Sequence, residues 1–217
     1  MIGFFIWLLK LAWVLWYNKS MDKIDAFLDG KAEQVLHDIE VNFQNLHLVY
    51  PCWKYLDSYR QGILEYMAYR VEDFAYPKIT TQRDAKAYFK RVDKFRKGKV
   101  PIGFVPSSSF WLVDGENYLG SGDVRHRLNE NLSRLGGHIG YSIRPAVWKQ
   151  GLGAIQLGLL LLEAQKLGIA RPMITCFDDN IGSIKVIEKN GGIRVNMVTN
   201  RVRGEKRLTR IYEINLN

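Results

Sequence analysis

The residues best suited to chemistry in this chain are the glycines of a short turn between a predicted strand and a predicted helix. The strand, 139–144, is followed by Pro145, and a few residues later the chain reads Gly151-Leu152-Gly153-Ala154. An apolar stretch at helical spacing, 151–167, begins there. Glycine lets the backbone approach a ligand closely, and the first turn of a helix has unpaired N–H groups that attract anions. The turn therefore predicts an anion site that suits a pyrophosphate.

Three known kinds of phosphate-binding turn can be compared with this segment. A P-loop needs Lys followed by Ser or Thr after its last glycine, and a dinucleotide fingerprint needs a third glycine where this chain has Gln156. The third kind is the acetyl-coenzyme A loop of the GNAT acetyltransferases, [RQ]xxGx[GA] after a strand that ends in V-x-P. Residues 148–153, WKQGLG, resemble that loop, with Trp148 where the family usually has Arg or Gln, and Ile143-Arg144-Pro145 resembles its strand end.

A second segment strengthens the resemblance. Asn180, Ser183 and Gly191-Gly192 are similar to the second helix of that family, N-x-x-[AS] followed later by G-[FG], at the expected distance from the loop. The resemblance covers about residues 45–217, and it is closest to a bacterial branch with an R-H-x-L-N segment before strand four. It implies an α/β fold of the α+β kind, the GNAT fold, with a mixed central sheet, a splayed pair of parallel strands and helices on both faces.

The resemblance implies an acetyl-CoA-dependent N-acetyltransferase, in which a primary amine, expected to be small, attacks the thioester without a covalent enzyme intermediate. Acetyl-CoA is the expected co-substrate, and no metal is expected. The fourth strand would bind the pantetheine arm and the thioester oxygen through its backbone, and the loop amides would bind the pyrophosphate. A side-chain amide on the second helix would bind the pantetheine arm or would only cap that helix. The strand backbone is that of Ser142, Ile143 and Arg144. The loop amides are those of Lys149, Gln150, Gly151, Leu152, Gly153 and Ala154. The residues of the second helix are Asn180, which carries the side-chain amide, and Ser183.

The sequence does not identify the general acid and the general base. The family often has a tyrosine seven residues after the asparagine, where it protonates the leaving thiolate, but this chain has Ile187. Another group or water then donates the proton, the thiolate leaves unprotonated, or the protein is not a catalyst. His126, His138 and Glu130 are the candidates for general base, since a neutral imidazole near pH 7 can deprotonate an ammonium. The rival interpretation is a non-catalytic acyl-CoA-binding or membrane-associated interaction protein.

The composition is that of a globular protein in a reducing compartment. The 217 residues are 47% hydrophobic and 24% charged, which excludes a disordered or low-complexity chain. Cys52 and Cys176 lie far apart without His or Cys at ligand spacing, which argues against a disulfide framework or structural zinc. The net charge is +9, but no aromatic-interleaved platform accompanies it. The expected partners are therefore the amine substrate and, as an open alternative, a second copy of the chain, but not nucleic acid.

The first 20 residues do not belong to the domain. Only Lys10 interrupts the apolar residues 1–17; a spanning helix needs about 20 apolar residues, and a central lysine costs about 2.5–3.5 kcal/mol. An N-terminal apolar helix is expected here, with three interpretations open: a marginal membrane anchor, a helix packed on the domain or a partner, or an artefact of an upstream start before Met21. The expected location is the cytoplasm, at the inner face of the membrane if residues 1–17 contact it.

Hydrophobic periodicity divides the rest into an amphipathic helical extension, 21–45, and the acetyltransferase domain, 46–217. Asp114-Gly115 is expected to close a hairpin, and 128–137 is expected to be a polar loop or short helix. The expected helices of the domain are 56–69, 83–96, 151–167 and 180–190. Its expected strands are 46–50, 109–113, 118–127, 139–144, 171–177 and a final pair around Arg203-Gly204.

Overall fold

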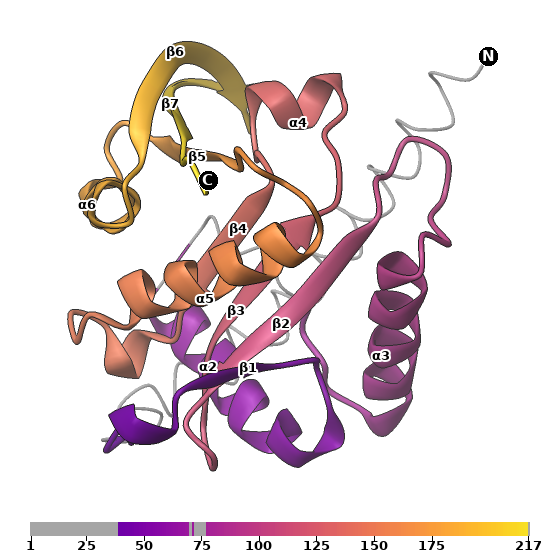
Figure 1. Ribbon diagram of the computed structural model, residues 1–217. Helices are drawn as coiled ribbons and strands as arrows, with labels where there is room; N and C mark the ends of the chain where they lie inside the picture. The colour runs from indigo at the N-terminus through magenta and orange to yellow at the C-terminus, as the bar shows by residue number, and fades with distance from the viewer. Residues whose placement is uncertain (1–38, 70, 72–76, 217) are drawn as a thin grey trace.

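The computed structural model describes residues 39–69, 71 and 77–216, and Figure 1 shows their arrangement. The apolar segment 1–20 and most of the extension 21–45 lie outside the described residues. Within the part that is described, no helix is long and apolar enough to cross a membrane. The α/β architecture expected from the resemblance is confirmed, with helices on both faces of a sheet.

The strands form two sheets. The first has the order β1 (His47–Val49), β2 (Ser107–Val113), β3 (Tyr118–Arg125) and β4 (Ile139–Ile143), and each neighbouring pair is antiparallel. The second has the order β5 (Met173–Phe177), β7 (Glu205–Glu213) and β6 (Ile193–Val202), also antiparallel. Both expected hairpins are present. At the second, Arg203 and Gly204 have positive φ values of 49° and 88°, as a tight two-residue hairpin turn requires.

The two sheets meet where β4 and β5 begin. Gly137 and Ile174 form a single bridge, and the N–H of His138 donates to the carbonyl of Met173 at 2.6 Å. The N–H of Met173 donates to the imidazole Nδ1 of His138 at 3.0 Å, so a side chain takes the place of the next backbone acceptor and the pairing stops. The expected splay between these strands is present. In place of one mixed sheet there are two sheets, and every strand pairing of the described residues is antiparallel.

Helices cover both faces of the first sheet (Figure 1). α2 (Leu56–Ala68) and α3 (Gln82–Arg96) pack against β3 and β2, whereas α5 (Leu152–Lys166) packs against β3 and β4. α6 (Ile181–Lys189) packs beside α5 and β5. These four helices begin and end within one residue of the bounds expected from the sequence. The remaining helical segments are short: α4 (Glu130–Arg134) and the 3-10 turns η2 (Phe43–Asn45), η3 (Trp53–Tyr55) and η4 (Pro145–Val147).

The core lies on both sides of the first sheet. Trp111 and Tyr118 are fully buried on the side of α2 and α3, where the Tyr59 ring centroid lies 4.6 Å from that of Trp111 and 5.0 Å from that of Tyr118. Leu112 and Val124 are fully buried on the opposite side, in clusters that include side chains of α5. Because side chains pack against both faces of the first sheet, the free edge of β4 is rigid and can form one side of a binding site.

Candidate functional site

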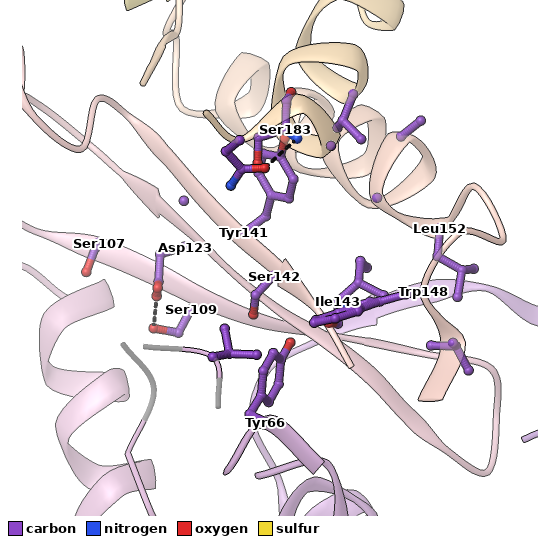
Figure 2. Close-up of a pocket in the computed structure, with 18 of the residues that line it drawn as sticks. Tyr66, Ser107, Ser109, Asp123, Tyr141, Ser142, Ile143, Trp148, Leu152 and Ser183 are labelled. Carbon is purple, nitrogen blue, oxygen red and sulfur yellow. Dashed lines mark hydrogen bonds between the residues drawn. The ribbon is translucent and has the colours of Figure 1, made fainter. Parts of the chain in front are cut away.

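A cavity of about 1090 Å³ lies along β4 and continues to the far side of the first sheet. One end is bounded by the turn before α5 and by the start of α6, and the other by α2, α3 and the polar ends of β2 and β3. In Figure 2, Trp148 and Leu152 stand at the first end, and Ser109 and Asp123 at the second. The predicted anion turn therefore shares one continuous space with polar side chains that are distant in sequence.

The turn before α5 has the geometry of an anion site. Gly151 is the N-cap residue and has φ +84°, in the left-handed region, and Lys149 also has a positive φ of 63°. Left-handed residues in a turn arrange successive N–H groups into a concave array. The carbonyl of Gly151 accepts from the N–H of Ala154 at 3.1 Å and of Ile155 at 3.4 Å. The amide of Ala154, expected among the ligand donors, is thus used by the helix, and the donors left for a ligand are those of 149–153.

A glycine and three lysines complete this end of the cavity. A Cβ on Gly153 would lie 3.1 Å from Cγ2 of Val186, so this glycine lets α5 and α6 pack closely as well as exposing backbone to a ligand. Lys149, Lys185 and Lys189 line the cavity here. Lys185 and Lys189 were not predicted from the sequence, although their i, i+4 spacing on a helix was an available signal. Three positive charges beside a helix N-terminus favour a polyanionic ligand.

The free edge of β4 presents backbone groups to the cavity. The N–H of Arg144 donates to the carbonyl of Leu119 in β3 at 2.8 Å. Because bonded residues alternate along an antiparallel ladder, the N–H of Ser142 also faces β3, whereas the N–H of Ile143 faces the cavity. The indole Nε1 of Trp148 donates to the carbonyl of Ile143 at 2.5 Å. Of the three residues expected to offer backbone donors, Ile143 is placed to do so, and Ser142 and Arg144 are not.

The side chain of Arg144 lies outside the cavity, in a buried ion pair. Arg144 is 1% exposed and Glu65 of α2 is fully buried, with Nη2 and Oε1 2.6 Å apart. The other carboxylate oxygen accepts the N–H of Ala146 at 3.1 Å, and the guanidinium also donates to Oγ of Ser58 at 3.1 Å. Arg144 was expected to contact the cofactor. Its side chain instead ties α2 to the chain that leaves β4, a few residues before the anion turn.

Asn180 both caps α6 and lines the cavity. Its Oδ1 accepts the N–H of Ser183 at 3.0 Å, while its Nδ2 is a separate donor, so the two roles expected as alternatives are compatible. Ser183 also lines the cavity, and its carbonyl accepts from the hydroxyl of Tyr141 at 3.4 Å (Figure 2). Gln150, in contrast, is exposed and does not line the cavity.

The position where the family has its tyrosine belongs to the core in this chain. Ile187 is fully buried against α5 and the second sheet and does not line the cavity. Among the residues that line the cavity, Tyr141 of β4 is the one whose phenol hydroxyl contacts α6. Burial raises the pKa of Tyr141 well above its ordinary value, so this hydroxyl is a neutral hydrogen-bond donor near pH 7.

None of the three predicted base candidates, all of them described, lines the cavity. Nε2 of His126 lies 2.9 Å from Oγ of buried Ser108, and Glu130 is exposed in the first turn of α4. His138 accepts a backbone N–H of β5, as shown above. Burial lowers the pKa of both histidines, and the charge of Arg125 adds to this effect at His138. The structure thus does not bring these residues together with the anion turn.

We expect part of the acid sensitivity of this fold to come from His138. Its pKa is lowered in the folded state, so the unfolded chain binds more protons below about pH 6.5 and stability falls as the pH drops through that range. His138→Asn keeps an acceptor for the N–H of Met173 without a titrating group. Urea unfolding at about pH 7.5 and 5.5 should therefore show a smaller loss of free energy in this variant than in wild type. Equal losses in the two proteins would contradict the assignment.

The other end of the cavity holds polar groups that the sequence analysis missed. Asp123 of β3 accepts from Oγ of Ser109 at 2.5 Å and pairs with Gly140 of β4. Tyr66 reaches in from α2 toward Ser142 (Figure 2), and burial raises the pKa of its hydroxyl well above the ordinary value. The available signal was an acidic residue inside the strand sequence Gly-Ser-Gly-Asp-Val, where a structural role would favour an apolar side chain.

Comparison with known proteins gives a consistent result. The sequence model of the acetyltransferase (GNAT) domain matches residues 56–193. RimL, a ribosomal L7/L12 alpha-N-protein acetyltransferase solved in its apo form, has a TM-score of 0.60 at 17% identity, over 83% of this chain and 96% of its own. The microcin C7 self-immunity acetyltransferase MccE, in complex with acetyl-CoA and AMP, has a TM-score of 0.59 at 15% identity, over 79% and 93%. A putative ribosomal-protein-serine acetyltransferase from Vibrio cholerae has a TM-score of 0.53 at 17% identity, over 82% and 98%. No curated protein matches the chain by sequence.

At these identities the solved structures show likeness of fold alone. The domain match, in contrast, is a match of sequence over more than half of the chain, from the start of α2 to the start of β6. It includes the anion turn, the free edge of β4 and the cap of α6. The chain therefore belongs to the acetyltransferase (GNAT) family.

Proposed function

We propose that this protein is an acetyl-CoA-dependent N-acetyltransferase that acts on a primary amine. The observation that carries the proposal is the continuous cavity, which joins the anion turn to the carboxylate of Asp123 along the free edge of β4. Acetyl-CoA has a polyanionic end and a thioester end, and the two ends of the cavity have matching chemistry. The RimL and V. cholerae acetyltransferases act on ribosomal proteins by their names, so protein and small-molecule amines are both open acceptors at this level.

The cofactor end would hold the phosphates with the amides of 149–153 and with the three lysines. The N–H of Ile143 and, by the same alternation, that of Tyr141 face the cavity and would bind the pantetheine arm and the thioester oxygen. One donor to a developing oxyanion lowers a barrier by about 2.7–4 kcal/mol. The Nδ2 of Asn180 would add a hydrogen bond to the arm. When bound, acetyl-CoA supplies the thioester carbon that the amine attacks.

Asp123 is the residue that would bind and deprotonate the acceptor amine. Among the described residues that line the cavity, it has the only carboxylate, and its half-buried position leaves it open to that space. Its partner across the ladder, Gly140, has no side chain to obstruct the path to β4. The carboxylate binds the ammonium and accepts one of its protons. The amine nitrogen then bonds to the acetyl carbon and the carbon–sulfur bond breaks. The new amide nitrogen releases its second proton to the departing thiolate, directly or through water, and coenzyme A leaves as the thiol.

The turn is tested by Gly151→Val. A Cβ at Gly151 meets nothing within 4 Å in the protein, so the substitution leaves packing intact but obstructs the ligand side of the turn. We expect the dissociation constant of acetyl-CoA, measured by calorimetry, to rise at least tenfold, or about 1.4 kcal/mol. Because φ is +84°, the variant should also lose about 1–2 kcal/mol of stability from backbone strain.

The matched control is Gly168→Val. Gly168 follows the other end of α5, has φ +76° and also meets nothing within 4 Å, so the backbone strain is the same in kind. This variant should lose similar stability and bind acetyl-CoA as wild type does. Equal affinities in the two variants would show that the turn is an ordinary connection between strand and helix.

The rival function, a non-catalytic acyl-CoA-binding or interaction protein, makes a different prediction from the same preparation. Binding of acetyl-CoA with no thiol release over a broad panel of protein and small-molecule amines would favour the rival. The absence of acetyl-CoA binding would contradict both functions. Cytoplasmic location, membrane contact through 1–17 and a homodimer stay predictions; cell fractionation and light scattering of the full chain measure them.

A further inference from the structure

Arg91 stands at the mouth of the acceptor end without a carboxylate partner among the described residues. It is exposed on α3 and lines the cavity, with its guanidinium 5.6 Å from the ring centroid of buried Tyr88. The other arginine that lines the cavity, Arg125, donates to the carbonyls of Gly136 and Gly137 at 3.0 Å each. Among the described residues at this end, the cation of Arg91 therefore lies over an aromatic ring and has no protein acceptor.

Tyr88 lies close to both Arg91 and Asp123. Burial raises the pKa of the Tyr88 hydroxyl far above its ordinary value, the carboxylate of Asp123 raises it further, and the guanidinium of Arg91 lowers it. One neutral phenol thus neighbours a fixed negative charge and a fixed positive charge that face the same cavity. A ligand that fills this end meets both charges.

An apolar wall lies beside these two charges. Val92, Phe95 and Phe104 line the cavity, and the rings of Phe95 and Phe104 meet edge to face with centroids 5.9 Å apart. Phe95 follows Arg91 by four residues on α3, so the guanidinium and this ring share one helix face. The acceptor end thus combines a carboxylate, a guanidinium and a hydrophobic surface.

We propose that the acceptor is an amino-acid-like amine: an ammonium bound by Asp123, a neighbouring anionic group bound by Arg91, and an apolar side chain against Phe95 and Phe104. This inference rests on the proposed function. Arg91 is not needed for the phosphates of acetyl-CoA, because the lysines of that end belong to the turn before α5 and to α6. α6 and α3 lie at opposite sides of the molecule (Figure 1).

The test compares pairs of amines that differ only by a carboxylate: phenylalanine with phenethylamine, and leucine with 3-methylbutylamine. In wild type, kcat/KM should be at least about tenfold higher for the amino acid of each pair, since a charge-assisted hydrogen bond is worth at least that factor. Arg91→Met should remove this preference, by lowering kcat/KM at least about tenfold for the amino acids and not lowering it for the amines that lack a carboxylate. Arg91→Lys should restore part of it.

The matched control is Arg83→Met. Arg83 is an exposed arginine two turns earlier on the same helix and does not line the cavity, so its variant should keep the wild-type preference. Equal kcat/KM within the pairs, equal losses for both members in Arg91→Met, or no turnover of any amino acid while acetyl-CoA binds would each overturn this inference alone. A wild-type protein that does not bind acetyl-CoA in calorimetry would instead overturn the proposed function.

Discussion

Asp123→Asn is expected to lower kcat/KM by about 10²–10⁴-fold and to leave the dissociation constant of acetyl-CoA unchanged. The substitution keeps the shape of the side chain and an oxygen that can accept from Ser109, but it removes the charge that binds the ammonium and the group that accepts its proton. Initial rates of thiol release with the best amine of the panel measure the first quantity, and calorimetry measures the second.

Two controls separate chemistry from structure at this site. Ser109→Ala removes the hydroxyl that holds the carboxylate but keeps its charge, so it should reduce kcat/KM much less than Asp123→Asn. The melting temperature of Asp123→Asn should equal or exceed that of wild type, because a half-buried charge no longer needs solvation. Full activity of Asp123→Asn would show that the amine binds elsewhere in the cavity.

Arg144→Met is expected to lower the free energy of unfolding by about 3–5 kcal/mol, the largest stability effect that we expect in this chain. The variant leaves the carboxylate of Glu65 fully buried and without its charge partner. The corresponding fall in melting temperature is about 6–20 °C for a chain of this size. Urea unfolding of the full chain measures the free energy, and differential scanning calorimetry the melting temperature.

The control for this stability prediction is an exposed ion pair that also joins an arginine to a carboxylate. Arg96 and Asp93 on α3 lie 2.8 Å apart but are each more than a third exposed, so Arg96→Met should change stability by less than about 1 kcal/mol. The double variant Glu65→Leu/Arg144→Met removes both buried charges and should recover most of the loss, since apolar residues often replace a buried pair without penalty. A small loss in Arg144→Met would mean that water reaches Glu65.

The ion pair also links stability to function. It holds the chain between β4 and η4, and the anion turn begins a few residues later. If the pair positions that turn, the double variant should be stable but should bind acetyl-CoA more weakly than wild type. Its dissociation constant separates this positioning role from a purely structural one.

The sequence alone determined the local parts of this protein. The four long helices and both hairpins are fixed by hydrophobic periodicity and by turn residues such as Asp114-Gly115, which act between neighbours in the chain. The anion turn was readable for the same reason, because a left-handed Gly151 and a helix N-terminus are properties of one short segment. The N-cap role of Asn180 is local in the same sense.

Which side chains line the cavity depends on how distant segments of the chain pack together. Asp123, Tyr66 and Arg91 lie on β3, α2 and α3, and they line one cavity because α2 and α3 pack on the same side of the first sheet. The same packing places two predicted site residues outside the cavity. The side chain of Arg144 forms an ion pair with α2, and that of His138 accepts the hydrogen bond at which the pairing of β4 with β5 ends. A titratable residue in a strand faces a core, a neighbouring strand or a cavity according to register and to what packs above it. These are properties of distant segments, which spacing along the chain does not encode.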